Sequence, residues 1–335
     1  MSKRSLGFFL TTLLFILPLL SLLIMRLIRD FSQRSLFPQG CVLTIGNFDG
    51  VHLGHRAVID KLAQCGRQLQ LPTVLMLFEP QPLEYFLGEN APSRLMRLRE
   101  KILALHLLPI DNVVILRFNR LLANFEPEQF VSDILVDKLN LKHLVIGDDF
   151  HFGKARRGNF NLLCAQGKQH GFSVEKSESY QLTDLRVSST LIRDALNADD
   201  LVQARRLLGQ DYAVCGRVAQ GNQLGRTLGF PTANIKMLRQ NTPIKGVFAV
   251  TMTGIDGVEF QGVANVGTRP TIDGHSKVIL ETHLFNFNQN IYGRYVSVHF
   301  KHKIRHEMRF DSLEQLQTQI RLDVATAKEF FEQSR

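Results

Sequence analysis

Two histidines in a glycine-rich segment form the densest group of chemistry-bearing side chains. His52 and His55 belong to the run GNFDGVHLGH, residues 46–55, which lies between a β-rich run and a helical pattern. Glycines let a phosphate approach the backbone, the helix start offers unpaired N–H groups, and imidazoles can donate to charge developing on a phosphate. The indicated chemistry is transfer at phosphorus. A turn with two surface histidines, or a zinc pair, is the alternative, although a third zinc ligand and an H-E-x-x-H arrangement are lacking nearby.

Two later segments carry polar side chains that suit the same chemistry. Asp148 follows an apolar run in the segment GDDFHFGK, and Arg186, Ser189 and Thr190 stand at the start of a helical pattern. We expect both segments at the ligand crevice of a parallel sheet. The simpler interpretation is a helix N-cap for the hydroxyls from Ser188 to Thr190, which we favour for Ser188 alone, and a solvated cation for Arg186. The sequence has no G-x-x-x-x-G-K-[ST] motif, so a nucleotide would be held differently from the way a P-loop holds it.

A second group lies in the C-terminal half, in the glycine-dense segment GRTLGFPTAN, residues 225–234. Thr232 and Asn234 are two residues apart on an extended segment, so their oxygens point to the same side and suit a hard cation. By themselves, these residues favour a Gly-rich hairpin that uses Pro, Thr and Asn in its turn.

One carboxylate stands in an apolar strand pattern, in the segment ETH. Glu281 and His283 share one face of this strand and Thr282 takes the other. A carboxylate on an inward face needs a reason. General-base catalysis is one reason, and an ion pair to Arg269 or Arg305 is the other.

The N-terminal half alternates strands and helices, which predicts a parallel sheet of Rossmann type with ligands at the carboxyl ends of its strands. Two helices near Ser189–Leu196 and Asp200–Leu208 close this half, and Gly209 is expected to end the second of them. The other predicted elements are a first strand after Met25, strands at Cys41–Ile45, Thr73–Phe78, Val113–Leu116 and Leu144–Ile146, and a helix at Gly54–Leu69.

After Tyr212 the pattern changes to short β-rich runs separated by Gly, Asn and Asp turns, which predicts a small antiparallel barrel. A C-terminal helix from Ser312 to Phe331 should pack across it. Residues 265–271 are expected to form a loop, and the basic stretch Lys301 to His306 is interpreted as a solvated strand edge rather than a nucleic-acid site. The predicted strands are Val247–Thr253, Gly257–Val263, Val278–Phe285 and Tyr295–Phe300.

Composition limits the classes of protein that fit. A chain of 335 residues suggests two domains, and a net charge of +9 without a long basic tract fits phosphorylated small molecules as well as nucleic acid. Four cysteines without a C-x-x-C pair indicate neither a disulfide framework nor a zinc knuckle. We interpret them as reduced thiols of a cytoplasmic protein; they are Cys41, Cys65, Cys164 and Cys215.

The N-terminus carries an apolar run, residues 6–25, flanked by basic residues on both sides. It is long enough for a membrane-spanning helix or an uncleaved signal, which would make the chain inner-membrane anchored. Positive charge at both ends and the interruption by Pro18 argue against that. We favour a translation start at Met25, so residues 1–24 are treated as a dispensable leader, and a membrane is a partner only if this leader is real.

Taken together, these motifs resemble, in order, those of the bacterial bifunctional riboflavin kinase/FAD synthetase family, from Met25 to the C-terminus. H-x-G-H is the nucleotidylyltransferase signature, and P-T-A-N is the riboflavin kinase motif. The resemblance implies an FMN adenylyltransferase domain at residues 25–209 and a riboflavin kinase domain at 210–335. Riboflavin would be phosphorylated to FMN, and FMN adenylylated to FAD, with ATP and Mg²⁺. The implied partners are these small molecules and no nucleic acid, and the oligomeric state stays open.

The resemblance also implies residue roles. In the first domain, His52 and His55 would hold the ATP phosphates and steady charge on the α-phosphate, and residues 78–82, FEPQP, would lie beside the flavin. The other ATP- and FMN-binding residues would be Gly46, Asn47, Asp49, Gly54, Asp148, Arg186, Ser189 and Thr190. Leu191 departs from a position that is often polar.

In the barrel, the resemblance assigns Glu281 as the base that takes a proton from the riboflavin 5′-hydroxyl, and Thr232 and Asn234 as magnesium ligands. The implied ATP and flavin contacts are Gly216, Gly225, Gly229, Pro231, Asn265, Arg269 and Arg305. Three other functions are weighed: a monofunctional enzyme with one degenerate half, a flavin- or nucleotide-binding regulator, and transfer to another phosphate acceptor.

Overall fold

The computed structural model describes residues 25–29, 31, 35–183, 185–221, 225, 228–239, 241–270 and 276–334, and side chains within these ranges except at 269, 270, 276 and 277. The leader, residues 1–24, lies outside the described residues. Within the described ranges, no helix has the length and apolar character needed to cross a membrane. All four cysteines are free thiols, as predicted.

Contacts divide the chain into two compact units. The first contains the chain before Asp49 together with His55–Phe86 and Ile102–Ser179, and the second contains Asp49–Gly54, Leu87–Lys101 and Tyr180–Arg335. The second unit therefore includes short pieces of the N-terminal half.

The first unit is built on six parallel strands in the order β1-β4-β3-β2-β5-β6, which confirms the predicted Rossmann-type sheet. All residues of the central strand β2 are buried, because helices cover both faces of the sheet. The chain moves from β2 to β3 on one side and returns to β5 on the other, so the topological switch point lies between β2 and β5. The strands are β1 (Arg26–Ile28), β2 (Cys41–Ile45), β3 (Thr73–Glu79), β4 (Asn112–Arg117), β5 (Leu141–Ile146) and β6 (Ser173–Lys176).

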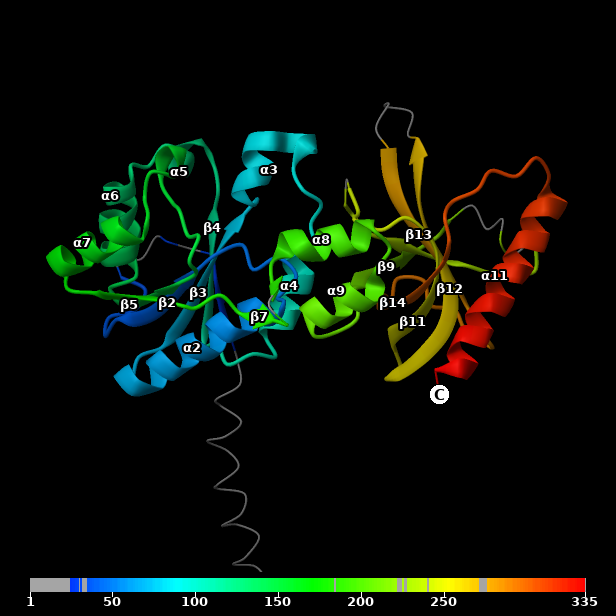
Figure 1. Cartoon of the computed structure of the whole chain (residues 1–335), viewed down its shortest axis with the longest axis horizontal. Helices are drawn as coiled ribbons and strands as arrows, with labels where there is room; N and C mark the ends of the chain where they lie inside the picture. The colour runs from blue at the N-terminus through cyan, green and yellow to red at the C-terminus, as the bar shows by residue number, and fades with distance from the viewer. Residues whose placement is uncertain are drawn as a thin grey trace, which may run out of the picture. The chain divides into compact units, whose positions relative to one another are not determined.

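Different helices cover the two faces of this sheet (Figure 1). Helix α2 (Leu53–Leu69) packs Leu62 and Cys65 against Val42 and Val145. The π-helical segment η2 (Phe130–Lys138) and helix α7 (Phe160–His170) belong to the core on the other face. The remaining helical segments of the N-terminal half are α3 (Pro82–Leu87), η1 (Gly88–Asn90), α4 (Leu98–Leu105), α5 (Arg120–Ala123), α6 (Pro127–Gln129) and η3 (Lys154–Arg156).

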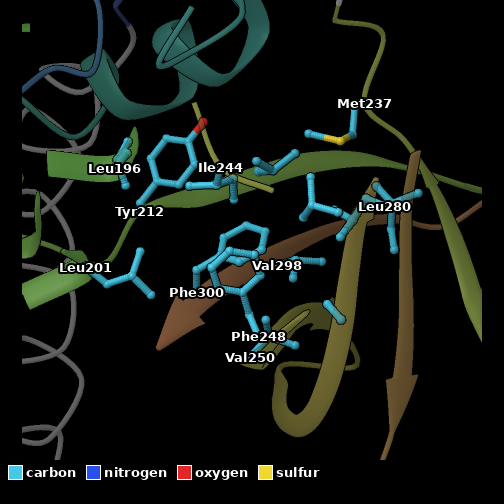
Figure 2. Packing of buried hydrophobic residues seen from close by; sticks show 14 of the residues in the cluster. Leu196, Leu201, Tyr212, Met237, Ile244, Phe248, Val250, Leu280, Val298 and Phe300 are labelled. Atoms are coloured by element: carbon cyan, nitrogen blue, oxygen red, sulfur yellow. The ribbon is translucent and has the colours of Figure 1, made fainter. Parts of the chain in front are cut away.

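The second unit contains a closed barrel of antiparallel strands in the order β10-β13-β12-β11-β14-β9, as predicted. Phe248, Val250, Leu280, Val298 and Phe300 fill its interior (Figure 2). Closure pairs every strand on both sides, so a barrel has no free edge. The strands are β9 (Ala213–Ala219), β10 (Ala233–Lys236), β11 (Gly246–Ile255), β12 (Val258–Pro270), β13 (Ser276–Leu284) and β14 (Tyr295–Arg305).

One expectation about this barrel is wrong. The segment from Asn265 to Pro270 is not a loop, because it continues β12 in register with β13. The basic stretch from Lys301 pairs with β11 as far as Arg305, whereas the pairing of β14 with β9 ends at His299.

Helices α8 (Ser189–Asn197) and α9 (Leu201–Leu208) share the core of the barrel through residues such as Leu196 and Leu201 (Figure 2). Helix α9 ends at Gly209, whose φ of 74° is left-handed, as the sequence predicts. A short ribbon, β7 (Gln181–Leu182) with β8 (Leu185–Arg186), precedes α8. These elements make one continuous hydrophobic core with the barrel.

A buried ion pair also lies in the second unit. Glu100 accepts a hydrogen bond from Arg239 at 2.5 Å through one carboxylate oxygen and from the Cys215 backbone N–H at 2.7 Å through the other. Arg239 also donates to the Tyr212 hydroxyl oxygen at 2.8 Å. The pair therefore joins the segment before β4 to the start of the barrel with its polar groups satisfied.

Helix α11 (Leu313–Gln333) packs across the outer face of the barrel, as expected (Figure 1). Ser312 caps it by accepting from the Gln315 N–H, and Ala327 and Phe331 pack against Val247 and Val263. Side chains on this outer face of the strands thus lie beneath a helix.

Candidate functional site

A cavity of about 260 Å³ opens on the outer face of the barrel, beside α11. Four residues selected from the sequence line it together: Thr232, Asn265, Glu281 and Arg305. The apolar part of the lining is formed by Leu228, Phe230, Met308, Phe310, Leu316 and Ile320. A mostly apolar cavity with a few convergent polar groups is typical of a small-molecule site.

Strand register places the polar groups of this cavity in one row. Glu281 on β13 is the direct neighbour of Asn234 on β10 and of Asn265 on β12. Thr282 is 1% exposed and points into the barrel, so the predicted alternation along this strand is confirmed. The expectation that Glu281 faces inward is wrong, because its face is the outer one, where the cavity rather than the core surrounds it.

Arg305 is held by a second charged residue in the cavity wall. Its Nε and Nη2 donate to the two oxygens of Asp323 at 2.8 Å each, and Asp323 is 4% exposed. The alternative predicted from the sequence was an ion pair between Arg305 and Glu281, but Arg305 pairs with Asp323 instead. The side chain of Arg269 lies outside the described part of the chain.

Asp323 was missed by reasoning from the sequence. Its signal was an acidic residue on the apolar face of the C-terminal helix, between Ile320 and Val324. Since acidic side chains are rarely buried without a partner, that pattern indicates a buried ion pair.

The P-T-A-N segment is fixed beside the cavity. His283 Nδ1 donates to the carbonyl oxygen of Pro231 at 2.9 Å. Thr232 lines the cavity, whereas the side chain of Asn234 lies against Gly221 and next to Glu281 in register.

The predicted glycines are placed differently from one another. Gly225 lines the cavity, and its carbonyl oxygen accepts from the Phe230 N–H at 2.7 Å. Gly229 follows in a left-handed conformation with φ of 84°. Gly216 lies between strands, where a Cβ would come within 2.5 Å of Ile235, and it does not line the cavity.

In the first unit, two predicted residues follow neighbouring strands at the switch point. Gly46 comes directly after β2, and Asp148 comes two residues after the end of β5. The carboxyl ends of parallel strands meet at one edge of a sheet, where ligands bind. Asn47 also follows β2. The Asp148 carboxylate accepts from the Ser179 hydroxyl at 2.5 Å.

The second histidine of the H-x-G-H motif lies against an aromatic ring. The ring of His55 packs on Phe48 with 4.8 Å between centroids.

The FEPQP segment ends β3 and begins α3. Phe78 and Tyr85 both contact the ring of Phe118, with centroids 5.9 and 5.4 Å apart. Phe86 on the same helix is 63% exposed. The segment thus presents aromatic side chains after the carboxyl end of a strand.

In the second unit, Asp49 fixes the loop that contains the H-x-G-H motif. Its carboxylate accepts from the backbone N–H groups of Leu95 and Met96 at 2.9 Å each and pairs with Arg193 at 2.6 Å. Its carbonyl oxygen accepts from the Ser189 hydroxyl at 2.8 Å. Asp49, Ser189 and Arg193 therefore hold this loop together.

His52 is 4% exposed, and its surroundings shift the pKa of its imidazole. The pKa of its imidazole is lowered to about 4; burial is the largest cause, Asp49 opposes the shift, and the Arg193 cation adds to it. The ring is therefore neutral at physiological pH and has one N–H to donate. Gly54 allows this packing, since a Cβ there would lie 3.2 Å from the His52 ring.

The remaining predicted residues lie at the start of α8. Ser188 caps the helix by accepting from the Leu191 N–H at 3.2 Å, which confirms the simpler interpretation of that residue. Arg186, on β8, and Thr190, in the first turn of α8, are both exposed.

Comparisons with known proteins match a different family to each half of the chain. The sequence model of the FAD synthetase family matches residues 35–191, and that of the riboflavin kinase family matches residues 208–331. The chain is similar to the bifunctional riboflavin kinase/FMN adenylyltransferase of Haemophilus influenzae, with 53% identity over 92% of this chain and 99% of that protein. It is also similar to the enzyme of the same name from Escherichia coli K12, with 48% identity over 92% and 98%.

A solved structure is similar over most of the length. A protein of Streptococcus pneumoniae, described as a macrolide-efflux protein, matches with a TM-score of 0.74 and 29% identity, over 90% of this chain and 97% of that one. The two proteins therefore share their fold over most of the length of both chains.

Proposed function

This chain belongs to the family of bifunctional riboflavin kinase/FMN adenylyltransferases, and from that premise we propose how its residues divide the two reactions. The enzyme phosphorylates riboflavin to FMN with ATP, and then transfers AMP from a second ATP to FMN, which gives FAD and pyrophosphate. We infer one site in the Rossmann-type half and one in the barrel.

The observation that carries the kinase assignment is the cavity shared by Thr232, Asn265, Glu281 and Arg305. Its apolar lining would enclose the flavin ring and exclude water. Glu281 would take the proton from the 5′-hydroxyl as its oxygen attacks the γ-phosphorus of ATP. Arg305, oriented by Asp323, would offer positive charge to the phosphates. Positioning and charge stabilisation thus account for the reaction without a covalent enzyme intermediate.

The same residues fit Mg²⁺. The Thr232 hydroxyl lines the cavity, and Asn234 stands beside Glu281 in register. A hydroxyl and an amide carbonyl are hard oxygen ligands of the kind that Mg²⁺ prefers. When bound there, the ion would neutralise phosphate charge.

For adenylyl transfer, we assign the nucleotide to the carboxyl ends of β2 and β5, where Gly46, Asn47 and Asp148 stand. His52 and His55 would donate to the ATP phosphates. Because the imidazole of His52 is neutral at physiological pH, its contribution would be a hydrogen bond rather than a full charge. The phosphate oxygen of FMN attacks the α-phosphorus in line, so no nucleophilic side chain is required.

We also place the boundary between the two family domains at residue 209, directly after α9, although α8 and α9 pack into the barrel core, and we place the enzyme in the cytoplasm. The support is the left-handed stop at Gly209 and the four free thiols. Fractionation of cells that express the chain with and without residues 1–24 tests the location.

Chromatography of products tests the two-site assignment. The purified chain, incubated with riboflavin, ATP and Mg²⁺, should yield FMN followed by FAD. Glu281→Gln should lower FMN formation by roughly 100- to 10,000-fold, the range expected for loss of a general base, and leave conversion of supplied FMN intact. The double change His52→Ala and His55→Ala should do the reverse.

Glu259→Gln is the matched control, since the Glu259 side chain is 53% exposed on the barrel surface. Circular dichroism establishes that each variant is folded. Loss of both activities in either folded variant would overturn the two-site assignment. Unchanged FMN formation in Glu281→Gln would remove the base role, and lack of turnover of either flavin by the unaltered chain would favour a binding protein.

A further inference from the structure

A thiol, an imidazole and a carboxylate converge in the first unit. Cys65 lies near the end of α2, His143 in β5 and Glu175 in β6. Their Sγ, Nε2 and carboxylate oxygen atoms all lie within 4.8 Å of one another. None of these residues has a role in the two transfers.

The separations fit one tetrahedral metal ion. Zn²⁺ binds sulfur at about 2.3 Å and nitrogen or oxygen at about 2.0 Å, so the edges of its tetrahedron measure roughly 3.5 Å from sulfur to oxygen and roughly 3.3 Å from nitrogen to oxygen. Here Cys65 Sγ lies 3.6 Å from Glu175 Oε2, and His143 Nε2 lies 3.4 Å from the same oxygen. Two edges are therefore already at coordination length.

A hydrogen-bond chain aims the free nitrogen of His143 at this point. The Ser173 hydroxyl donates to the Lys142 carbonyl at 3.4 Å, so its oxygen accepts from His143 Nδ1 at 2.7 Å. Nε2 is then unprotonated in the neutral ring, and it is buried without a hydrogen bond among the described residues. A hydrogen bond at the other ring nitrogen is how proteins orient a metal-binding histidine.

The charges of the ligands also suit a divalent cation. Lys61 Nζ pairs with Glu175 Oε1 at 2.8 Å and leaves Oε2 to face the other two groups. A thiolate and a carboxylate together neutralise a divalent cation, and the thiolate selects a soft ion over Mg²⁺. The alternative is a protonated His143 paired with Glu175, with Cys65 serving as an apolar filler beside Leu62.

We propose that Cys65, His143 and Glu175 bind one thiophilic divalent metal ion, Zn²⁺, which ties α2 to β5 and β6. Three protein ligands leave the fourth tetrahedral position to water. The ion stabilises the first unit and takes no part in phosphoryl or adenylyl transfer.

Cobalt absorption tests the proposal with a signal that belongs to the thiolate. The full chain, freed of metal with a chelator, is titrated with Co²⁺ alone. We expect a sulfur-to-cobalt charge-transfer band that saturates at one ion per chain and is displaced by Zn²⁺. Cys65→Ser should abolish this band and Cys164→Ser, the matched control in α7, should retain it. At 100-fold excess of Zn²⁺ over its dissociation constant, the Tm should rise by about 5–10 °C.

Absence of a stoichiometric band, or a band that survives in Cys65→Ser, overturns the proposal. A band lost in Cys164→Ser but kept in Cys65→Ser places the metal elsewhere and overturns it equally. If Cys65→Ser does not fold, Glu175→Gln takes its place, since that side chain is 38% exposed; saturation of the band at the same Co²⁺ concentration in this variant also counts against the site.

Discussion

The buried, neutral His52 makes stability depend on acidity in a calculable way. The pKa of His52 is lowered from 6.5 to about 4, with burial as the largest cause. Above pH 6.5 neither the folded nor the unfolded state binds this proton, so the full stability is present. As the pH falls from 6.5 toward 4, the unfolded state binds a proton at His52 that the folded state does not bind. The free energy of unfolding should fall by about 1.4 kcal/mol per pH unit, or about 3 kcal/mol in total.

The contribution of His52 to the free energy of unfolding can be measured by urea denaturation of the unaltered chain and of His52→Gln at several pH values between 7.5 and 4.5. Glutamine does not titrate, so the difference in free energy of unfolding between the two proteins should shrink steadily below pH 6.5. The control is His106→Gln, at an exposed position, which should run parallel to the unaltered chain. A difference between the unaltered chain and His52→Gln that stays constant from pH 7.5 to 4.5 would refute the reasoning.

Three further outcomes are expected. Asp323→Asn frees Arg305 from its bidentate partner and should lower riboflavin phosphorylation roughly 100-fold, the cost of misplacing a positioned group, while chromatography shows FAD formation from FMN unchanged. Glu100→Ala leaves Arg239 buried and unpaired and should lower the free energy of unfolding in urea by about 3–5 kcal/mol, against no change if the pair is exposed in solution. Gly50→Ala brings a Cβ to 2.8 Å from a Leu95 methyl group at a φ of +88°. This change should lower the free energy of unfolding by roughly 1–3 kcal/mol and should lower the rate of FAD formation as well. A thermal stability equal to that of the unaltered chain would contradict the prediction.

The sequence predicted those parts of the fold that depend on local pattern. The strand Cys41–Ile45 was predicted with its observed bounds, because a strand buried on both faces is a continuous apolar run between turn signals. The alternation of Glu281 and Thr282 follows from the two-residue repeat of any strand. The length of β12 was underestimated, because the glycine and proline near its end were interpreted as loop residues.

What the sequence did not predict depends on contacts between distant residues. Arg193 lies 144 positions from Asp49, and Arg239 lies 139 positions from Glu100, so no local pattern connects either pair. The orientation of Arg305 depends on a carboxylate from a different element, and only the fold brings the two together. Motifs therefore predicted which groups take part, whereas only the tertiary structure shows how those groups are held.

Because Glu281 lies on the outside of a filled barrel, selection for folding and selection for activity act on alternate residues of a single strand. Leu280 and Thr282 point into the barrel, while Glu281 and His283 face the cavity. In a saturation mutagenesis of β13, the effect of substitution should alternate residue by residue. Substitutions at positions 280 and 282 should lower the amount of folded protein, whereas substitutions at positions 281 and 283 should lower flavin turnover. Evolution can thus alter the choice of substrate without repacking the barrel interior.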